Sequence, residues 1–393
     1  MPMRRLPAIR TEVVVVGHGA TGLFAAIELA SNGHEVVLVG NGTPSSEMST
    51  GCITFPEEAE WWGELGLDDG FMREALAGVD QRIGKALSVG PCTWEGSSER
   101  RMALVTNLGT IIRTNYAPST SSRHDIVAIR GAKVAALGFH GNKDLEPGLF
   151  SKMLRSEAGV ETSSYWAAPV PAESQRPHIE MNQGIRHSQD ALTESLEGID
   201  ADLVVLPPFT QMVGHDRAWR DIADKAGKRL CEAVTPLSLP GRSLVSAFGR
   251  AALEVGARDL NGTLLERIDL KGDEVIALCR SGLRQVEVRA EMMLFCGGNV
   301  VGGGLDISGR AVIDPLSFFD IKKGAAGSST FDLATRSGIA CDPHFRSMSN
   351  GVRTEQVLVA GAALPGLNFA NGFGIGACLT TALAACRAIE EAH

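Results

Sequence analysis

The clearest apolar pattern in the chain lies near its start, in VVVVGHGATGLFAAIELASNGHEVVLVG, residues 13–40. The four valines at 13–16 show no alternation of apolar and polar positions, which is typical of a parallel strand buried on both faces. Residues 20–30 predict a helix that ends at Asn32-Gly33, and residues 35–39 predict a second strand. The pattern therefore predicts a βαβ unit.

After this unit the pattern becomes more mixed. Residues 57–90 predict a helical stretch, and residues 102–106 and 108–114 predict a hairpin that turns at Asn107. From about residue 120 to about 260, predicted strands (124–129, 201–206) alternate with predicted helices (150–158, 191–197, 217–226, 243–255). We interpret residues 51–261, which contain this region, as a second α/β domain. It is inserted into a first domain made of residues 1–50 and 262–393.

The C-terminal third begins with a β-meander. Strands are predicted at 264–270, 274–280 and 285–290, and the meander feeds a further apolar strand at 292–296. That strand ends at Gly297 and Gly298. Later a strand ending at Gly361 precedes a second glycine loop and a long helix of small residues at 378–391; the loop contains Asn371, Gly372, Gly374 and Ile375.

The first βαβ unit carries a glycine motif. Gly17, Gly19 and Gly22 have the G-x-G-x-x-G spacing, after a strand and at the start of a helix. Gly17 permits the tight turn, Gly19 lets the backbone approach a pyrophosphate, and Gly22 lets the helix pack closely. The N–H groups at Ala20 and Thr21, at the positive end of the helix dipole, would face the phosphates. The motif predicts dinucleotide binding, and a purely structural turn is the alternative. The turn at Gly297-Gly298, Gly361 and the second glycine loop repeat this arrangement near the C-terminus, and we expect them to bind the cofactor as well.

The residues that follow this motif depart from the usual dinucleotide-binding pattern. Asn41 stands where the motif usually has Asp or Glu to hold an adenosine ribose. Asn41 could make a weaker, neutral hydrogen bond to the ribose instead. No Arg lies nearby to bind a ribose phosphate, which argues against NADP. The departure from the motif makes NAD and FAD less secure and keeps FMN open. Ser49, Thr50 and Gly51 form a loop of the kind that wraps a cofactor, although an ordinary solvated loop is the alternative. His18 is expected to contribute only its backbone N–H.

Composition excludes several classes. The 393 residues are 44% hydrophobic and 21% charged, as in soluble globular proteins. A net charge of −9 gives no electrostatic basis for nucleic-acid binding. Neither a signal peptide nor a run of about 20 apolar residues is present, so we expect a cytoplasmic protein. The eight cysteines form no C-x-x-C pair, which argues against a metal site.

Taken together, the chain resembles the B subunit of anaerobic glycerol-3-phosphate dehydrogenase, within the wider fumarate-reductase-like flavoprotein group. The resemblance extends over nearly the whole chain. It is carried by VVVVGHGATG, the 49–51 loop, LGT with Arg113, the strand into Leu206-Pro207, TPLSLPG, GGGL and VAGAALPGLNFANGFGIGACLTTALAA. It implies a Rossmann-like α/β fold of the two-dinucleotide-binding flavoprotein type, with the β-meander and the inserted α/β domain. The ending here has fewer consecutive glycines than that family.

The resemblance also implies a function. It indicates an FAD-dependent oxidoreductase subunit, with FMN as the alternative, that works with a second flavoprotein subunit and an iron–sulfur subunit delivering electrons to quinone. Contact with the inner face of a membrane would then be indirect, through a partner. Arg113 and Arg310 could clamp an anionic substrate, and His140 could carry a proton. For each of these three, an ordinary surface role is the alternative.

Two other functions are also compatible with the sequence. One is a stand-alone flavin reductase or dehydrogenase of a small organic acid, which would turn over with a soluble dye. The other is a non-catalytic subunit whose bound flavin relays electrons or supports assembly.

Overall fold

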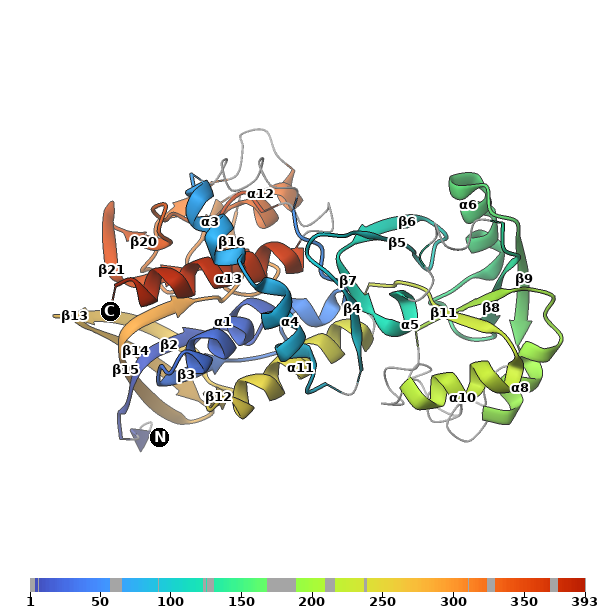
Figure 1. Cartoon of the computed structure of the whole chain (residues 1–393). Coiled ribbons are helices and arrows are strands. Elements are labelled where there is room, and N and C mark those ends of the chain that lie inside the picture. Colours follow the sequence, from blue (N-terminus) through green and yellow to red (C-terminus); the bar gives the residue numbers. More distant parts are fainter. Residues whose placement is uncertain are drawn as a thin grey trace. The chain divides into compact units, whose positions relative to one another are not determined.

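The computed structural model of the chain has two compact units (Figure 1). Unit 1 comprises Met1–Ser46, Thr54–Val89 and Val245–His393, and unit 2 comprises Glu47–Ile53 and Gly90–Leu244. The structure describes residues 4–5, 7–56, 66–90, 92–122, 125, 131–167, 189–208, 216–236, 239–309, 311–323, 329–367 and 374–392.

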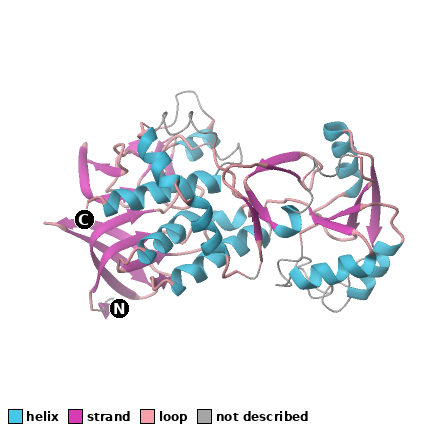
Figure 2. Ribbon diagram, in the orientation of Figure 1, coloured by secondary structure: helices cyan, strands magenta, loops and turns pink. Residues whose placement is uncertain are grey.

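Unit 1 is built on a sheet with the strand order β12-β3-β2-β15-β14-β13, in which β21 also pairs with β15 (Figure 2). These strands are β2 (Ile9–Val16), β3 (Val36–Gly40), β12 (Arg258–Asn261), β13 (Leu264–Lys271), β14 (Glu274–Ser281), β15 (Arg284–Phe295) and β21 (Val352–Val359). Neighbours in the series β12, β3, β2, β15 and β21 are parallel. Val13, Val14 and Val15 are fully buried in the middle of this series, as their unbroken apolar run predicts.

The meander differs from the prediction at β15. Residues 285–290 and 292–296 were predicted as two strands, but β15 is one continuous strand. Its first half is antiparallel to β14, and its second half is parallel to β21; β2 runs parallel along its other side. Burial alternates in the first half and is continuous in the second. The change in the sequence pattern therefore marks a change of neighbours, not the end of a strand.

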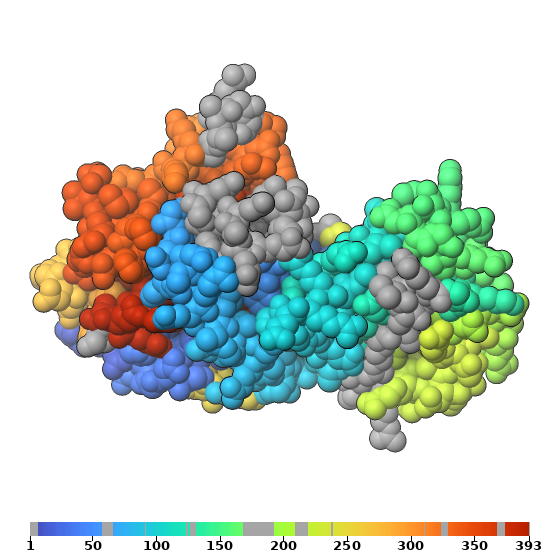
Figure 3. Space-filling view, turned by 45° about the horizontal axis from the view of Figure 1, so that its top comes forward, coloured from blue at the N-terminus to red at the C-terminus, as the bar shows by residue number. Residues whose placement is uncertain are grey.

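Unit 1 also contains helices. They are α1 (Ala20–Ser31), α3 (Asp69–Leu76), α4 (Val79–Leu87), α11 (Leu239–Glu254), which begins in unit 2, α12 (Thr330–Arg336) and α13 (Gly374–Glu390). Helix α13 packs against α1 and α3, and it is so deeply buried that little of it shows, in red, in Figure 3. The predicted helical stretch 57–90 is interrupted at Gly78, whose φ of +75° caps α4; residues 57–65 lie outside the described residues.

Unit 2 has its own parallel sheet, in the order β11-β10-β8-β9. Its strands are β8 (Val134–Phe139), β9 (Thr162–Ala167), β10 (Leu203–Leu206) and β11 (Arg229–Glu232). One face packs against α6 (Pro147–Ala158), and the other packs against α8 (Gln189–Glu197) and α10 (Asp216–Ala226). The sequence pattern missed β8, β9 and β11. The strand predicted at 124–129 lies outside the described residues, apart from Asp125.

The predicted hairpin is confirmed as β5 (Met102–Val105) and β6 (Ile111–Thr114). The remaining elements are short: β1 (Arg4–Arg5), η1 (Ser45–Met48), β4 (Trp94–Gly96), β7 (Tyr116–Pro118), α5 (Ser119–Ser122), β16 (Asp306–Ser308), β17 (Ala311–Ile313), β18 (Ile321–Lys322), β19 (Gly338–Ile339), β20 (Arg346–Ser349) and η2 (Gly361–Ala363). The Rossmann-like α/β fold with a β-meander is confirmed. The compact units differ from the predicted domain boundaries, because residues 54–89 and 245–261 belong to the unit that contains the main sheet.

Candidate functional site

The carboxyl ends of three parallel strands meet at one edge of the unit 1 sheet. Cys296 N donates to Val16 O over 2.7 Å, and Ala360 N donates to Phe295 O over 3.0 Å. This brings the ends of β2, β15 and β21 together, and with them the predicted site residues Gly17, Gly297, Gly298 and Gly361. Ligands of open parallel sheets bind beyond such carboxyl ends. The contact of these glycines with a cofactor stays a prediction.

The three glycines of the first motif have distinct surroundings. Gly17 has φ of +123°, and a Cβ there would lie 2.3 Å from Cys296 O. A Cβ on Gly22 would lie 2.0 Å from Gly17 O, so the helix can approach the turn only without a side chain. Around Gly19, by contrast, the nearest atom to such a Cβ, Ser46 Oγ, is 3.6 Å away. Gly17 and Gly22 therefore allow close packing, while Gly19 leaves room for a ligand to approach the backbone.

The first turn of α1 is suited to an anion. Its N-cap residue, Gly19, makes no side-chain cap, and the first turn carries no acidic residue. Ala20 N donates to Ser46 Oγ over 3.1 Å. The backbone N–H groups and the positive end of the helix dipole attract phosphate at such a position. The sequence pattern does not single out Ser46, although this residue lies in the hydroxyl-rich loop after β3.

Gly361, just after β21, lies beside the first glycine motif. A Cβ on Gly361 would lie 2.1 Å from Thr21 Oγ1, and Gly361 N donates to Thr381 Oγ1 over 2.9 Å. Thr21 thus packs α1 against the end of β21. Gly374 and Ile375 begin α13, whereas the predicted Asn371 and Gly372 lie outside the described residues.

The 49–51 loop, in unit 2, uses its hydroxyls locally. Ser49 Oγ accepts from Gly51 N, and Thr50 Oγ1 accepts from Cys52 N. Such turns satisfy the backbone of the loop itself. Gly51, with φ of +73°, packs tightly, since a Cβ there would lie 2.6 Å from Pro240 Cβ. The predicted cofactor role of this loop stays a prediction, as does that of the exposed Asn41 after β3.

The predicted catalytic residues are placed separately. Arg113 is exposed on β6, and His140 is exposed just after β8, with its ring stacked on Trp166 at a centroid distance of 5.0 Å. Arg310 lies outside the described residues. In the part of the chain that the structure describes, no hydrogen bond or ring contact links Arg113 with His140.

The side chain of His18 makes a contact that the sequence pattern does not indicate. Its Nε2 lies 2.6 Å from Asp259 Oδ1 on β12, so the residue contributes more than its backbone N–H. A Cβ on Gly40 would lie 2.3 Å from His18 Nδ1, which shows that the ring lies directly over the end of β3. No local signal predicts this contact, because 241 positions separate the two residues.

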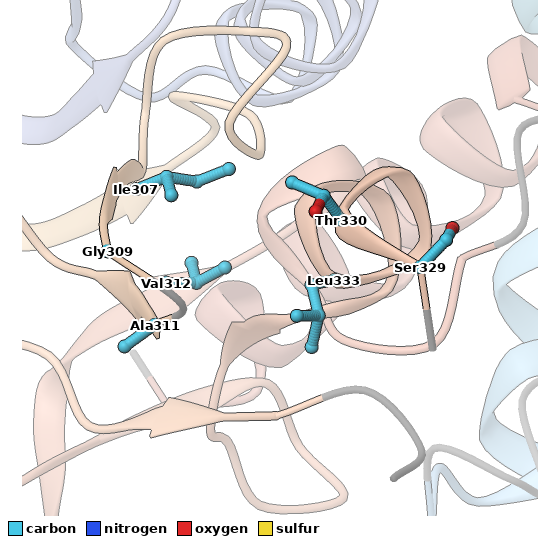
Figure 4. Close-up of a pocket in the computed structure, with 7 residues that line it drawn as sticks. All are labelled: Ile307, Gly309, Ala311, Val312, Ser329, Thr330 and Leu333. Atoms are coloured by element: carbon cyan, nitrogen blue, oxygen red, sulfur yellow. The ribbon is translucent and has the colours of Figure 1, made fainter. Parts of the chain in front are cut away.

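Unit 1 also contains a cavity of about 340 Å³ (Figure 4). The side chains of Ile307 and Val312, from the β16–β17 hairpin, face those of Thr330 and Leu333, from α12. Gly309, Ala311 and Ser329 complete the lining. The described glycines of the two motifs are absent from this lining, so the cavity is separate from the strand ends described above.

Comparison with known proteins identifies the class of the chain. The sequence model of a family described as an FAD binding domain matches residues 12–87, which include part of β2 and all of α1 and β3. The chain is a flavin-dependent oxidoreductase, and its cofactor is FAD. The glycine cradle at Gly17, Gly19 and Gly22 fits this group, since it offers open backbone and a helix N-terminus to a pyrophosphate.

The particular relatives agree with the predicted resemblance, which is confirmed. The chain is similar to the B subunit of anaerobic glycerol-3-phosphate dehydrogenase from Yersinia enterocolitica, at 25% identity over 98% of this chain and 99% of the relative. It is also similar to the protein of the same name from Actinobacillus pleuropneumoniae, at 23% identity over 95% of this chain and 97% of the relative.

A solved structure of 3-ketosteroid delta1-dehydrogenase from Sterolibacterium denitrificans covers 98% of this chain and 100% of its own, at 10% identity and a TM-score of 0.46. In the ranges that the structure describes, each helix is too short or too polar to cross a membrane.

Buried thiols give a first testable expectation. Burial raises the pKa of Cys52 to about 11 and that of Cys231 to about 12. On the order of one Cys52 thiol in a thousand is then ionised at pH 8, and the thiolate is the reactive form. We expect a chromogenic disulfide reagent to modify these two thiols at pH 8 only after denaturant is added. Rapid modification of Cys52 in the native protein, mapped by mass spectrometry, would contradict this.

The same shifts set a direction for stability. Because the folded-state pKa is raised above the unfolded value, these thiols contribute stability that is complete below about pH 8.5 and is lost as pH rises toward 11 and beyond. Urea midpoints measured from pH 8 to pH 11 should therefore fall more slowly when Cys52 and Cys231 are both replaced by alanine.

Proposed function

We propose that this chain is the flavin-bearing component of a multi-subunit dehydrogenase that oxidises a small anionic substrate resembling glycerol 3-phosphate. Electrons would then pass to an iron–sulfur subunit and on to quinone, with a second flavoprotein subunit in the complex. The observation that carries this proposal is the similarity to the B subunit of the Yersinia dehydrogenase, which extends over 98% of this chain and 99% of the relative. Any contact with a membrane would be made through a partner.

The residues of the chain have proposed roles in binding. The first turn of α1 and the open backbone at Gly19 hold the pyrophosphate, and the first turn of α13 offers a positive helix end to the flavin ring. When bound, FAD supplies the acceptor for a hydride taken from the substrate. Arg113 and Arg310 are proposed to bind the substrate anion, and His140 is proposed to carry the released proton.

The test is made on the gently purified chain under anaerobic conditions. The extracted chromophore is identified by mass, and glycerol 3-phosphate is added while the flavin absorbance is followed. Bleaching of the flavin supports the proposal, and bleaching that requires co-expression with a second flavoprotein subunit assigns the dehydrogenation to that partner. Turnover with a soluble dye and a small organic acid, in the absence of any partner, would replace the proposal with a stand-alone dehydrogenase.

A non-catalytic relay role is the second candidate. It is favoured by the separate positions of Arg113 and His140, which share no contact among the described residues. It predicts that FAD remains oxidised with every small anion tested and is reduced only within the assembled complex.

A further inference from the structure

The end of β3 lacks the group that usually selects an adenosine cofactor. The standard motif has an acidic residue here, whose carboxylate accepts hydrogen bonds from the ribose hydroxyls. In this chain the strand ends at Gly40, and the exposed Asn41 follows. Since a neutral amide is the weaker acceptor, a carboxylate from another element is needed to bind the ribose equally well.

The neighbouring strand supplies a carboxylate. Strand β12 runs parallel to β3, with Asp259 beside Leu38 and Asn261 beside Gly40. Asp259 therefore lies close to the carboxyl end of β3, and its side chain is 28% exposed. In the described part of the chain, His18 makes the only hydrogen bond to this carboxylate, through Oδ1. Oδ2 thus keeps its capacity to accept from a ligand.

His18 fixes the position of this carboxylate. Its ring crosses the end of β3 through the space that a side chain on Gly40 would fill. Its Nδ1 is buried and has no hydrogen-bond partner among the described residues, so Nε2, facing Asp259, is the polar contact of the ring. His18 is itself part of the first glycine motif, which means that the pyrophosphate turn and the carboxylate are held together.

We propose that the Asp259 carboxylate, positioned by His18, binds the ribose hydroxyls of the FAD adenosine and replaces the acid missing after β3. This selects FAD over FMN, which has no adenosine. It also disfavours a ribose that carries a phosphate, since the two negative charges repel. The inference concerns selection of the cofactor, so it stands or falls independently of the proposed substrate and partners.

The experiment compares FAD and FMN binding to the apoprotein, titrated by flavin fluorescence. Asp259→Asn is expected to raise the Kd for FAD about 10–100-fold, the value of one or two hydrogen bonds to a charged group. The Kd for FMN should not change. Asp269→Asn is the matched control, because Asp269 is another paired acid of this sheet, 2.7 Å from Arg267. This variant should bind FAD and FMN with unchanged affinity.

A second variant distinguishes a specific loss of FAD binding from misfolding. His18→Asn should weaken FAD binding by a smaller factor than Asp259→Asn and leave FMN binding unchanged. Its control is His34→Asn, because His34 pairs with Glu12 at the opposite, amino end of these strands. If Asp259→Asn and His18→Asn each weaken the binding of FAD and of FMN by the same factor, the proposal is overturned, and the pair only supports the fold. Unchanged FAD affinity in Asp259→Asn would overturn it as well.

Discussion

Replacing Gly22 by alanine is expected to abolish the retention of FAD during purification and to reduce the free energy of unfolding by about 3 kcal/mol. The added Cβ would lie 2.0 Å from Gly17 O and 3.4 Å from Cys296 Cβ. Backbone cannot yield as a flexible side chain does, so α1 must move away from the turn. That movement displaces the N–H groups that we propose face the pyrophosphate. FAD content after gel filtration and a urea titration measure the two effects.

Gly84→Ala is the matched control for this variant. Gly84 also lies inside a helix, α4, but a Cβ there meets no atom within 4 Å. Since alanine is the better helix former by about 1 kcal/mol, this variant should be slightly more stable than the parent and should keep its FAD. Retention of FAD by Gly22→Ala at the parent level would show that the close approach of helix and turn is not needed.

Replacing Gly376, in α13, by alanine should have the second largest effect on stability. A Cβ at this position, in the first turn of α13, would lie 2.0 Å from Thr54 O and 2.5 Å from Thr54 C. We expect a loss of about 2–3 kcal/mol in the free energy of unfolding, because either α13 or the segment at Thr54 must shift. Urea titration measures this loss.

The same variant tests the role proposed for α13. If its positive end stabilises the negative charge of the reduced flavin, its displacement should make the midpoint potential of bound FAD more negative, by about 20 mV for each kcal/mol of helix-dipole interaction lost. Gly249→Ala is the control, since Gly249 lies in α11 with no atom within 4 Å of its added Cβ. An unchanged potential in a destabilised Gly376→Ala protein would place the end of α13 away from the flavin ring.

The sequence predicted best where the physical signal is local. The βαβ unit at residues 13–40 was predicted because four buried valines, a glycine turn and a helix follow one another directly, and the structure has β2, α1 and β3 there. Strand β15 was divided in the prediction because its two halves have different neighbours and therefore different polarity patterns. Strand β8 was missed although all six of its residues are buried.

In the candidate site, too, the sequence predicted local features but not contacts between distant segments. The spacing of Gly17, Gly19 and Gly22 indicated a phosphate cradle, because that chemistry depends on backbone within a few positions. The pairing of His18 with Asp259 could not be predicted, since β12 has only four residues and no apolar alternation. Gly51 was predicted as part of a cofactor-binding loop, and Gly376 was not predicted as a site residue. Only the folded chain shows which atoms exclude a side chain at these two positions.

By itself, therefore, the sequence determined the Rossmann-like fold, the flavin cofactor class and the resemblance to a dehydrogenase subunit, because these depend on short patterns repeated in order along the chain. The tertiary structure alone decided which strands are neighbours, which glycines are confined by packing, and which carboxylate lies at the end of β3. Those properties depend on parallel pairing between segments more than 200 positions apart, such as β3 and β12, and no local pattern records them.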